Sequence, residues 1–390
     1  VQSTRAGARS GFVLLWAVLL ANLFKYPFFE FGPRYAAATG ESLIEGYRRL
    51  GRGALALYLL FTVATTFPVQ AAVTVVTAGL AGQLFPALGL GAPGWSALLL
   101  AACALVLVAG RYALLDGLIK VVIIALSLST LVAVAMALGT SAAPAPEFSP
   151  PPLWDGAGVS FLVGLMGWMP APIDIAAWHS LWTLERQKQT HHAPSLGEAR
   201  FDFNIGFLGT ALLAVGFLSL GALVMYGSGQ RFPAGAIGFA GQLLELYTSS
   251  LGLWARPLIG VAAFTTMFST TLTVLDAYPR VLQHTLALRR TEIGAPPEPR
   301  ERSYWLALLC LCAGALAILF FLISELKRLV DFATTVSFLA APALAWINFR
   351  VVQSDPMPAV ARPGPALRAL SWAGLLFLVG FSALFLLRKL

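Results

Sequence analysis

The residues best suited to chemistry lie in one apolar stretch near the middle of the chain, from Gly164 to Ser180. Its sequence, Gly-Leu-Met-Gly-Trp-Met-Pro-Ala-Pro-Ile-Asp-Ile-Ala-Ala-Trp-His-Ser, contains Pro170, Pro172 and Asp174. Each proline removes a backbone N–H donor and clashes with the preceding turn, so a helix cannot run straight through this stretch. Breaks of this kind expose backbone carbonyls that can bind a cation inside a membrane.

Asp174 follows this break directly, and an ionisable group is costly to bury in a membrane. We expect it at the N-terminus of a second half-helix, where the helix dipole favours an anion. The candidate metal-binding residues are therefore Asp174 and the backbone of Met169, Pro170 and Ala171. The alternative is a structural kink with Asp174 as its helix cap. We favour the functional interpretation because transporters concentrate such breaks at their binding sites.

Four further polar residues are candidates for a transport path: Lys25, Glu30, Gln70 and His179. Glu30 precedes Arg34 by four residues on one helix face, which suits an ion pair. A buried structural ion network is the favoured interpretation of that pair, with gating or transport as the alternative. Lys25 lies deeper in the same segment and has no obvious partner in the sequence. His179 follows the break and could touch a cavity, whereas core packing is the main alternative for Gln70.

The elements that must position these residues are membrane helices. Hydrophobic residues make up 58% of the chain and charged residues 11%, with a mean hydropathy of +0.78. Soluble domains average about 25% charged residues, so this chain lacks the polar surface that water requires. The sequence predicts an all-α polytopic membrane protein with one transmembrane domain over residues 1–390. Ten segments are expected to span the bilayer: 11–39, 53–83, 94–109, 113–138, 157–183, 203–226, 253–278, 303–323, 329–350 and 367–388.

The basic residues of the loops predict the orientation of these segments. Alternate loops, beginning with the one after the first segment and counted with the neighbouring segment ends, hold 16 Lys and Arg residues, whereas the remaining loops hold 4. Cytoplasmic loops are enriched in Lys and Arg, so the C-terminus is expected outside. The net charge of +8 therefore reflects insertion topology, and we expect the lipid bilayer as a partner and no nucleic acid. The oligomeric state is not predicted by any of these features.

Several stretches resemble, in order along the chain, the helices of the Nramp (natural resistance-associated macrophage protein) family of divalent metal ion transporters. The N-terminal residues Ala6–Phe12 resemble the end of that family's first helix, and the central break resembles its sixth helix. The remaining similar stretches are Gly11–Trp16 with Arg34 and Thr39-Gly40 for the second helix, Ser269–Thr273 for the eighth, and Val336–Phe338 with Pro342 for the tenth.

This resemblance implies a LeuT-type inverted-repeat helical bundle, with about ten spans present and the first helix largely missing from this sequence. It also implies an integral, multi-pass protein of the bacterial inner (plasma) membrane with its C-terminus outside. The implied activity is secondary transport of a divalent cation, with the metal ion as substrate and no cofactor. The divalent cation that the resemblance implies is of the manganese, iron or magnesium type.

The chain departs from the family pattern at several functional positions. The family's Met-Pro-His signature is not intact, because Ala171 follows Met169-Pro170. Alignment backward from His179 instead puts Asp174 in place of the histidine. Matching Gln70 to the family's third-helix glutamine leaves no acidic residue beside it, and this favours transport without proton coupling. Loss of the methionine ligand favours an ion that prefers oxygen ligands, such as magnesium or manganese.

Two other functions compete with metal transport. The first is a carrier of the same fold for a small organic solute, which the altered metal ligands make plausible. The second is a non-transporting membrane sensor. An enzyme is not expected, because the sequence contains no paired catalytic carboxylates and no nucleophile with an adjacent base.

Overall fold

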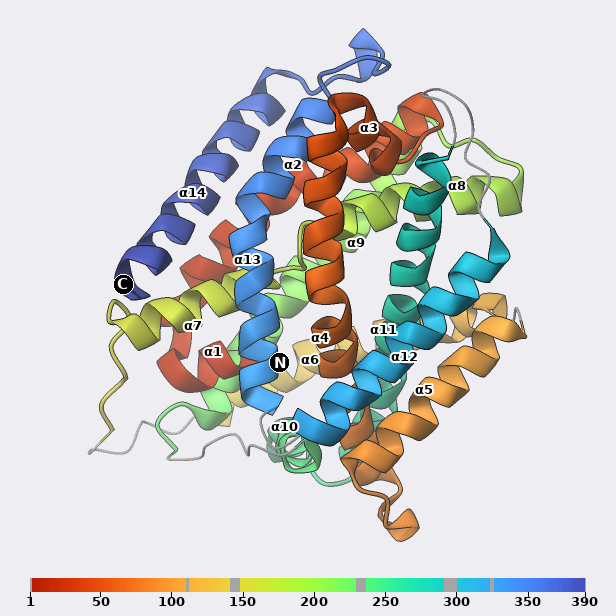
Figure 1. Cartoon of the computed structure of the whole chain (residues 1–390). Coiled ribbons are helices and arrows are strands. Elements are labelled where there is room, and N and C mark those ends of the chain that lie inside the picture. Colours follow the sequence, from red (N-terminus) through yellow and green to blue (C-terminus); the bar gives the residue numbers. More distant parts are fainter. Residues whose placement is uncertain are drawn as a thin grey trace.

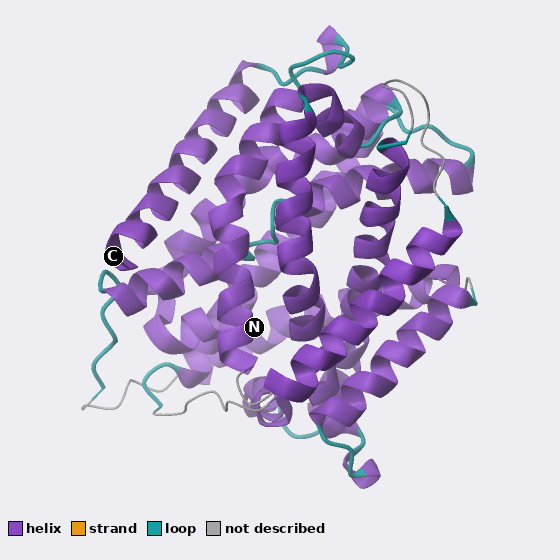
Figure 2. Cartoon of the chain, viewed as in Figure 1, coloured by secondary structure: helices purple, strands orange, loops and turns teal. Residues whose placement is uncertain are grey.

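The computed structural model describes residues 2–109, 112–140, 148–228, 236–290, 300–322 and 326–389. This part of the chain forms helices joined by short loops and contains no strand (Figure 2). The α-helices are α1 (Gln2–Ser10), α2 (Leu15–Thr39), α3 (Leu43–Leu50), α4 (Arg52–Leu84), α5 (Ala92–Val108), α6 (Tyr112–Thr140), α7 (Gly156–Gly167), α8 (Ile175–Thr190), α9 (Leu196–Leu220), α10 (Ala236–Leu251), α11 (Ala255–Leu288), α12 (Glu301–Leu322), α13 (Leu326–Val351) and α14 (Pro365–Lys389).

Each of the ten predicted segments contains helix. Among the described residues, seven helical stretches are long and apolar enough to cross a membrane, and three shorter apolar helices lie at 92–108, 123–139 and 156–167. The predicted end of one segment, residue 323, lies outside the described residues. Two helices were not predicted: α3, which follows α2, and α10, which lies within a predicted loop. The all-helical membrane architecture is therefore confirmed.

Helix α2 runs through the bundle and packs against α8, α9 and α14 (Figure 1). Small residues allow the backbones to approach closely, as is common between membrane helices. A Cβ atom on Gly32 of α2 would lie 2.3 Å from the carbonyl oxygen of Ala176 in α8. A Cβ on Gly7 of α1 would lie 2.0 Å from the carbonyl oxygen of Leu218 in α9. The segment around the predicted break is thus held tightly against α2.

Helix α3 connects α2 and α4 through a capped, half-buried turn at one end of the bundle. Ser42 and Glu45 form a capping box. The Ser42 hydroxyl accepts a hydrogen bond from a backbone N–H of the first turn, and the Glu45 carboxylate accepts one from the Ser42 N–H. The Leu43 N–H donates to Ser180 Oγ of α8 at 3.0 Å. His284 Nε2 of α11 lies 2.9 Å from Glu45 Oε1. This short helix therefore ties α8 and α11 together.

The loops that connect the helices lie at two opposite ends of the bundle. The α2–α4 connection, which contains Arg48 and Arg49, and the α13–α14 connection, which contains Arg362, lie at the upper end of the view in Figure 1, whereas the α4–α5 connection lies at the lower end. This arrangement agrees with the alternation of basic and neutral loops in the sequence.

Candidate functional site

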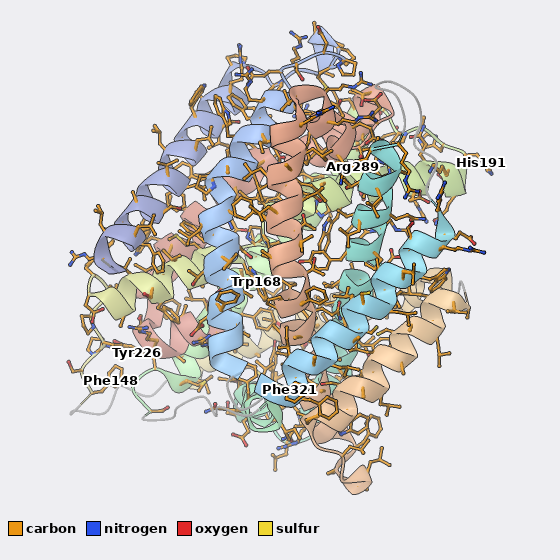
Figure 3. All side chains as sticks on the ribbon, in the orientation of Figure 1. Phe148, Trp168, His191, Tyr226, Arg289 and Phe321 are labelled. Atoms are coloured by element: carbon orange, nitrogen blue, oxygen red, sulfur yellow. The ribbon has the colours of Figure 1, made fainter. Side chains whose placement is uncertain are left out.

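The predicted break interrupts the fifth predicted segment, 157–183, inside the bundle. Helix α7 ends at Gly167 and α8 begins at Ile175, and no helix covers the residues between them. Figure 3 places Trp168, the first residue after α7, at mid-height in the bundle. Its indole Nε1 donates to Ser337 Oγ of α13 at 3.1 Å. The prolines therefore break the helix within the bundle, as the sequence predicted.

Lys25 of α2 reaches the broken end of α7. Its Nζ donates to the carbonyl oxygens of Met166 at 2.6 Å, Gly167 at 2.9 Å and Ala171 at 3.2 Å. The side chain is fully buried. The last carbonyls of a helix have no partner within it, so the ammonium satisfies groups that α7 leaves free. The sequence showed no partner for Lys25, and in the structure its partners are backbone carbonyl oxygens.

Asp174 lies at the N-terminus of α8, as expected, and is buried. Its carboxylate interacts with the backbone N–H groups of Asp174 and Ile175 at the start of α8. The carboxylate interacts electrostatically with the Lys25 ammonium. It also lies within electrostatic reach of three buried tyrosines, Tyr47, Tyr58 and Tyr278. These three tyrosines lie on α3, α4 and α11.

Three polar side chains near Asp174 were not predicted as site residues. Tyr58 and Thr62 are one helical turn apart on α4, and Trp178 lies on the first turn of α8. The Tyr58 hydroxyl, the Thr62 Oγ1 and the Trp178 Nε1 are buried, and the Tyr58 hydroxyl interacts with both of the other groups. Because buried polar atoms normally have partners, these three side chains form one polar cluster inside the bundle. The only signal in the sequence was the spacing of Tyr58 and Thr62 on one helix face.

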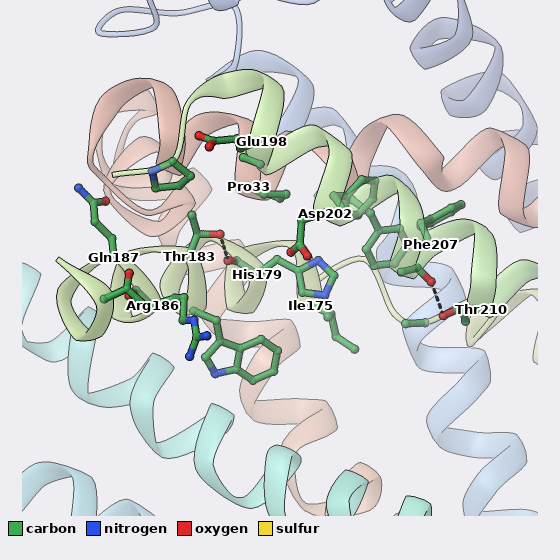
Figure 4. A pocket seen from close by; sticks show the side chains of 18 of the residues that line it. Pro33, Ile175, His179, Thr183, Arg186, Gln187, Glu198, Asp202, Phe207 and Thr210 are labelled. Atoms are coloured by element: carbon green, nitrogen blue, oxygen red, sulfur yellow. Dashed lines mark hydrogen bonds between the residues drawn. The ribbon is translucent and has the colours of Figure 1, made fainter. Parts of the chain in front are cut away.

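A cavity of about 850 Å³ lies on the other side of the break, between α8 and α9 (Figure 4). Pro170 and Ala171 of the break line it, together with His179. The His179 ring packs against Phe29 and Phe203, and its Nδ1 has no hydrogen-bond partner in the described structure. The prediction that His179 touches a cavity is therefore consistent with the geometry.

The Asp202 carboxylate of α9 points toward the imidazole of His179 in Figure 4. Arg186 and Glu198 also line this cavity, so charged side chains of both helices face it. The cavity therefore combines an aromatic wall with charged groups, and it reaches the backbone of the break.

Two of the predicted transport-path residues do not contact the break. Glu30 pairs with Arg34 and lies 3.3 Å from Arg200 Nε of α9, as in the structural network that the sequence favoured. Gln70 of α4 donates to Thr74 Oγ1 at 3.0 Å and lies against α11. Its Oε1 has no hydrogen-bond partner among the residues described.

The donor set at the break consists mainly of backbone oxygen atoms and one carboxylate. In the described part of the chain, no three His, Cys, Asp or Glu side chains form a group that could hold a metal ion. Met169 is buried, so its side chain is part of the packed core around the break. Such an oxygen-rich site suits a hard cation better than a soft one.

Comparisons with known proteins agree with this architecture. The model of the family described as natural resistance-associated macrophage protein-like matches residues 2–388. An uncharacterised protein of Pasteurella multocida is 36% identical over 393 residues, which cover all of this chain and 88% of that protein.

Two crystal structures of the Eremococcus coleocola manganese transporter are also similar. One is of a single-residue mutant and has a TM-score of 0.71 at 15% identity, and the other contains a bound aromatic bis-isothiourea compound and has a TM-score of 0.67 at 14% identity. Each alignment covers 98% of this chain and 81% of the transporter chain. These similarities show that the fold is that of the LeuT-type transporters, as the resemblance in the sequence implied.

Proposed function

This chain belongs to the natural resistance-associated macrophage protein-like family, and from that premise we propose that it moves a divalent metal cation across a membrane by alternating access. The family consists of membrane transporters, and the chain is not an enzyme. We further propose the bacterial inner membrane as its location, with the C-terminus outside, because the basic loops alternate along the chain.

The observation that supports metal transport most strongly is the broken helix, in which Asp174 lies at the start of the second half-helix, α8. Discontinuous helices form the substrate sites of many secondary transporters, with carbonyls and half-helix ends facing the ion. The proposed metal-binding elements are the Asp174 carboxylate and the backbone oxygens of Met169, Pro170 and Ala171. A carbonyl oxygen has two lone pairs, so Ala171 can accept from Lys25 and still face a cation.

The chemistry of this site favours manganese or magnesium over softer ions. Carboxylate and carbonyl oxygens suit both of these ions. The manganese transporter named above has the same fold, although that similarity alone does not identify the substrate of this chain. Transport without proton coupling is part of the proposal, since Gln70 has hydroxyl and carbonyl groups rather than carboxylates as its partners.

The proposal can be tested by uptake of Mn²⁺, Fe²⁺ and Mg²⁺ into proteoliposomes. We expect Asp174→Ala to reduce uptake at least tenfold relative to the intact protein. Glu185→Ala is the matched control, because Glu185 is a half-exposed acidic residue on the same helix that pairs with Lys188. Unchanged uptake by Asp174→Ala would remove Asp174 from the site. Absence of uptake of all three ions by the intact protein would overturn the metal proposal.

The second candidate is a small organic solute, which the lack of a cluster of metal-ligating side chains among the described residues favours. Opposite charges at Lys25 and Asp174 could bind a zwitterion, but the three carbonyl contacts of Lys25 use all three of its donors. A thermal-shift panel of metals and amino acids would separate the two candidates. The absence of any substrate-dependent stabilisation would instead support a non-transporting sensor.

A further inference from the structure

The ammonium of Lys25 has the surroundings of a bound monovalent cation. It lies against three carbonyl oxygens at 2.6 to 3.2 Å, and no part of the side chain reaches the surface. Snorkelling toward water, the usual behaviour of lysine in a membrane, is therefore excluded. The carbonyls of Met166 and Gly167 belong to the last two residues of α7.

The carbonyl groups at the end of α7 favour a positively charged partner. The C-terminal end of a helix carries the negative end of its dipole, and its last carbonyls have no partner within the helix. The Met169 N–H donates to the Met166 carbonyl at 3.3 Å, but the prolines that follow have no backbone N–H to donate. In broken membrane helices, such half-helix ends coordinate sodium ions or protons. Here a side chain of α2 reaches the same kind of position.

We propose that Lys25 is a tethered cation that takes the place of a dissolved coupling ion at the break. This inference rests on the proposed function only in treating the break as a transport site. Lys25 holds the end of α7, and with Asp174 it forms a site of balanced charge before substrate binds. The site therefore keeps its shape without bound sodium or potassium.

The opposite charges of Lys25 and Asp174 support the role of Lys25 as a tethered cation. Asp174 is the charged group that interacts electrostatically with the ammonium. One positive and one negative charge leave a neutral pair inside the membrane, where an unpaired charge is costly. A dissolved monovalent cation at this position would have to compete with Lys25 for the same carbonyl oxygens.

The test compares thermal stability in sodium, potassium, ammonium and choline chloride at equal ionic strength. For the intact protein we expect one melting temperature in all four salts, since the cation position is already filled. For Lys25→Ala we expect a lower melting temperature in choline and a saturable recovery of several degrees in ammonium, sodium or potassium. Lys188→Ala removes an exposed lysine of α8 and should behave like the intact protein in every salt.

Two results would overturn the inference. The first is saturable stabilisation of the intact protein by sodium or potassium over choline, which needs no variant. The second is an equal loss of stability by Lys25→Ala in all four salts, which would make Lys25 an ordinary packing residue. These measurements do not involve metal uptake, so a failure of metal transport would leave the result on Lys25 intact, and the reverse also holds.

Discussion

The Arg34 guanidinium holds the Glu30 carboxylate from one helical turn away. Arg34 Nη2 donates to Glu30 Oε1 and Arg34 Nε donates to Glu30 Oε2, each at 2.7 Å. Arg34 Nη1 also donates to the Ala361 carbonyl at 2.8 Å, which ties α2 to the connection before α14. Both side chains are buried. The pair is thus a fixed part of the bundle.

Arg34→Met should be strongly destabilising, because it leaves the buried Glu30 carboxylate with Arg200 as its remaining partner. The expected loss is about 3–5 kcal/mol, the cost of removing one partner from a buried ion pair. Thermal unfolding in detergent would measure it. The double variant Glu30→Met with Arg34→Met should recover most of the loss and retain uptake. Loss of uptake at recovered stability would instead place Glu30 in the transport path.

Gly32→Ala should separate α2 from α8 near the break. The new Cβ would lie 2.3 Å from the Ala176 carbonyl oxygen, so the backbones must move apart. We expect a loss of about 1–3 kcal/mol, typical of overpacking, together with reduced uptake. Gly209→Ala in α9 is the control, because its Cβ would meet no atom within 4 Å. That change should be neutral or stabilising by up to about 1 kcal/mol through helix propensity. Equal effects of the two variants on melting temperature would refute the close contact.

The Glu45–His284 contact predicts an acid-sensitive attachment of α3. Burial alone would raise the pKa of Glu45, but the hydrogen bond and charge of His284, together with the Ser42 hydroxyl, bring it below its ordinary value of 4.5. A carboxyl group whose pKa is lowered by folding stabilises the protein above its unfolded pKa and loses this effect as pH falls through the folded value. The melting temperature should therefore fall more steeply below about pH 4.5 in the intact protein than in Glu45→Gln. Parallel pH profiles would contradict this role of Glu45.

Tyr47→Phe should destabilise the junction of α3 and α13. The Tyr47 hydroxyl donates to Asn348 Oδ1 at 2.6 Å, and Asn348 Nδ2 donates to the Phe28 carbonyl at 3.2 Å. Loss of the hydroxyl leaves the buried Asn348 oxygen without this donor, at a cost of about 1–3 kcal/mol. Tyr226→Phe keeps the edge-to-face contact of that ring with Phe148 and is the control for a lost hydroxyl. A melting temperature unchanged by Tyr47→Phe would show that Asn348 finds another donor.

The membrane class, the helical segments and the position of the break could all be predicted from the amino-acid sequence. Apolar length identifies a span without reference to its neighbours, and the prolines at 170 and 172 act on their own helix. It also identified Asp174 as the residue that begins the second half-helix. The Glu30–Arg34 pair was predictable for the same reason, because four residues separate partners on one helix face.

The groups that face the break could not be predicted from the sequence, because they come from other helices. The contact between Lys25 and the end of α7 joins residues more than 140 positions apart, and backbone carbonyls have no signature in a sequence. The helices α3 and α10 were missed because short amphipathic elements lack the apolar length that marks a span. The polar cluster of Tyr58, Thr62 and Trp178 likewise arises from the packing of α4 against other parts of the bundle. Local pattern fixes each helix, but the environment of a buried charge depends on which helices meet around it.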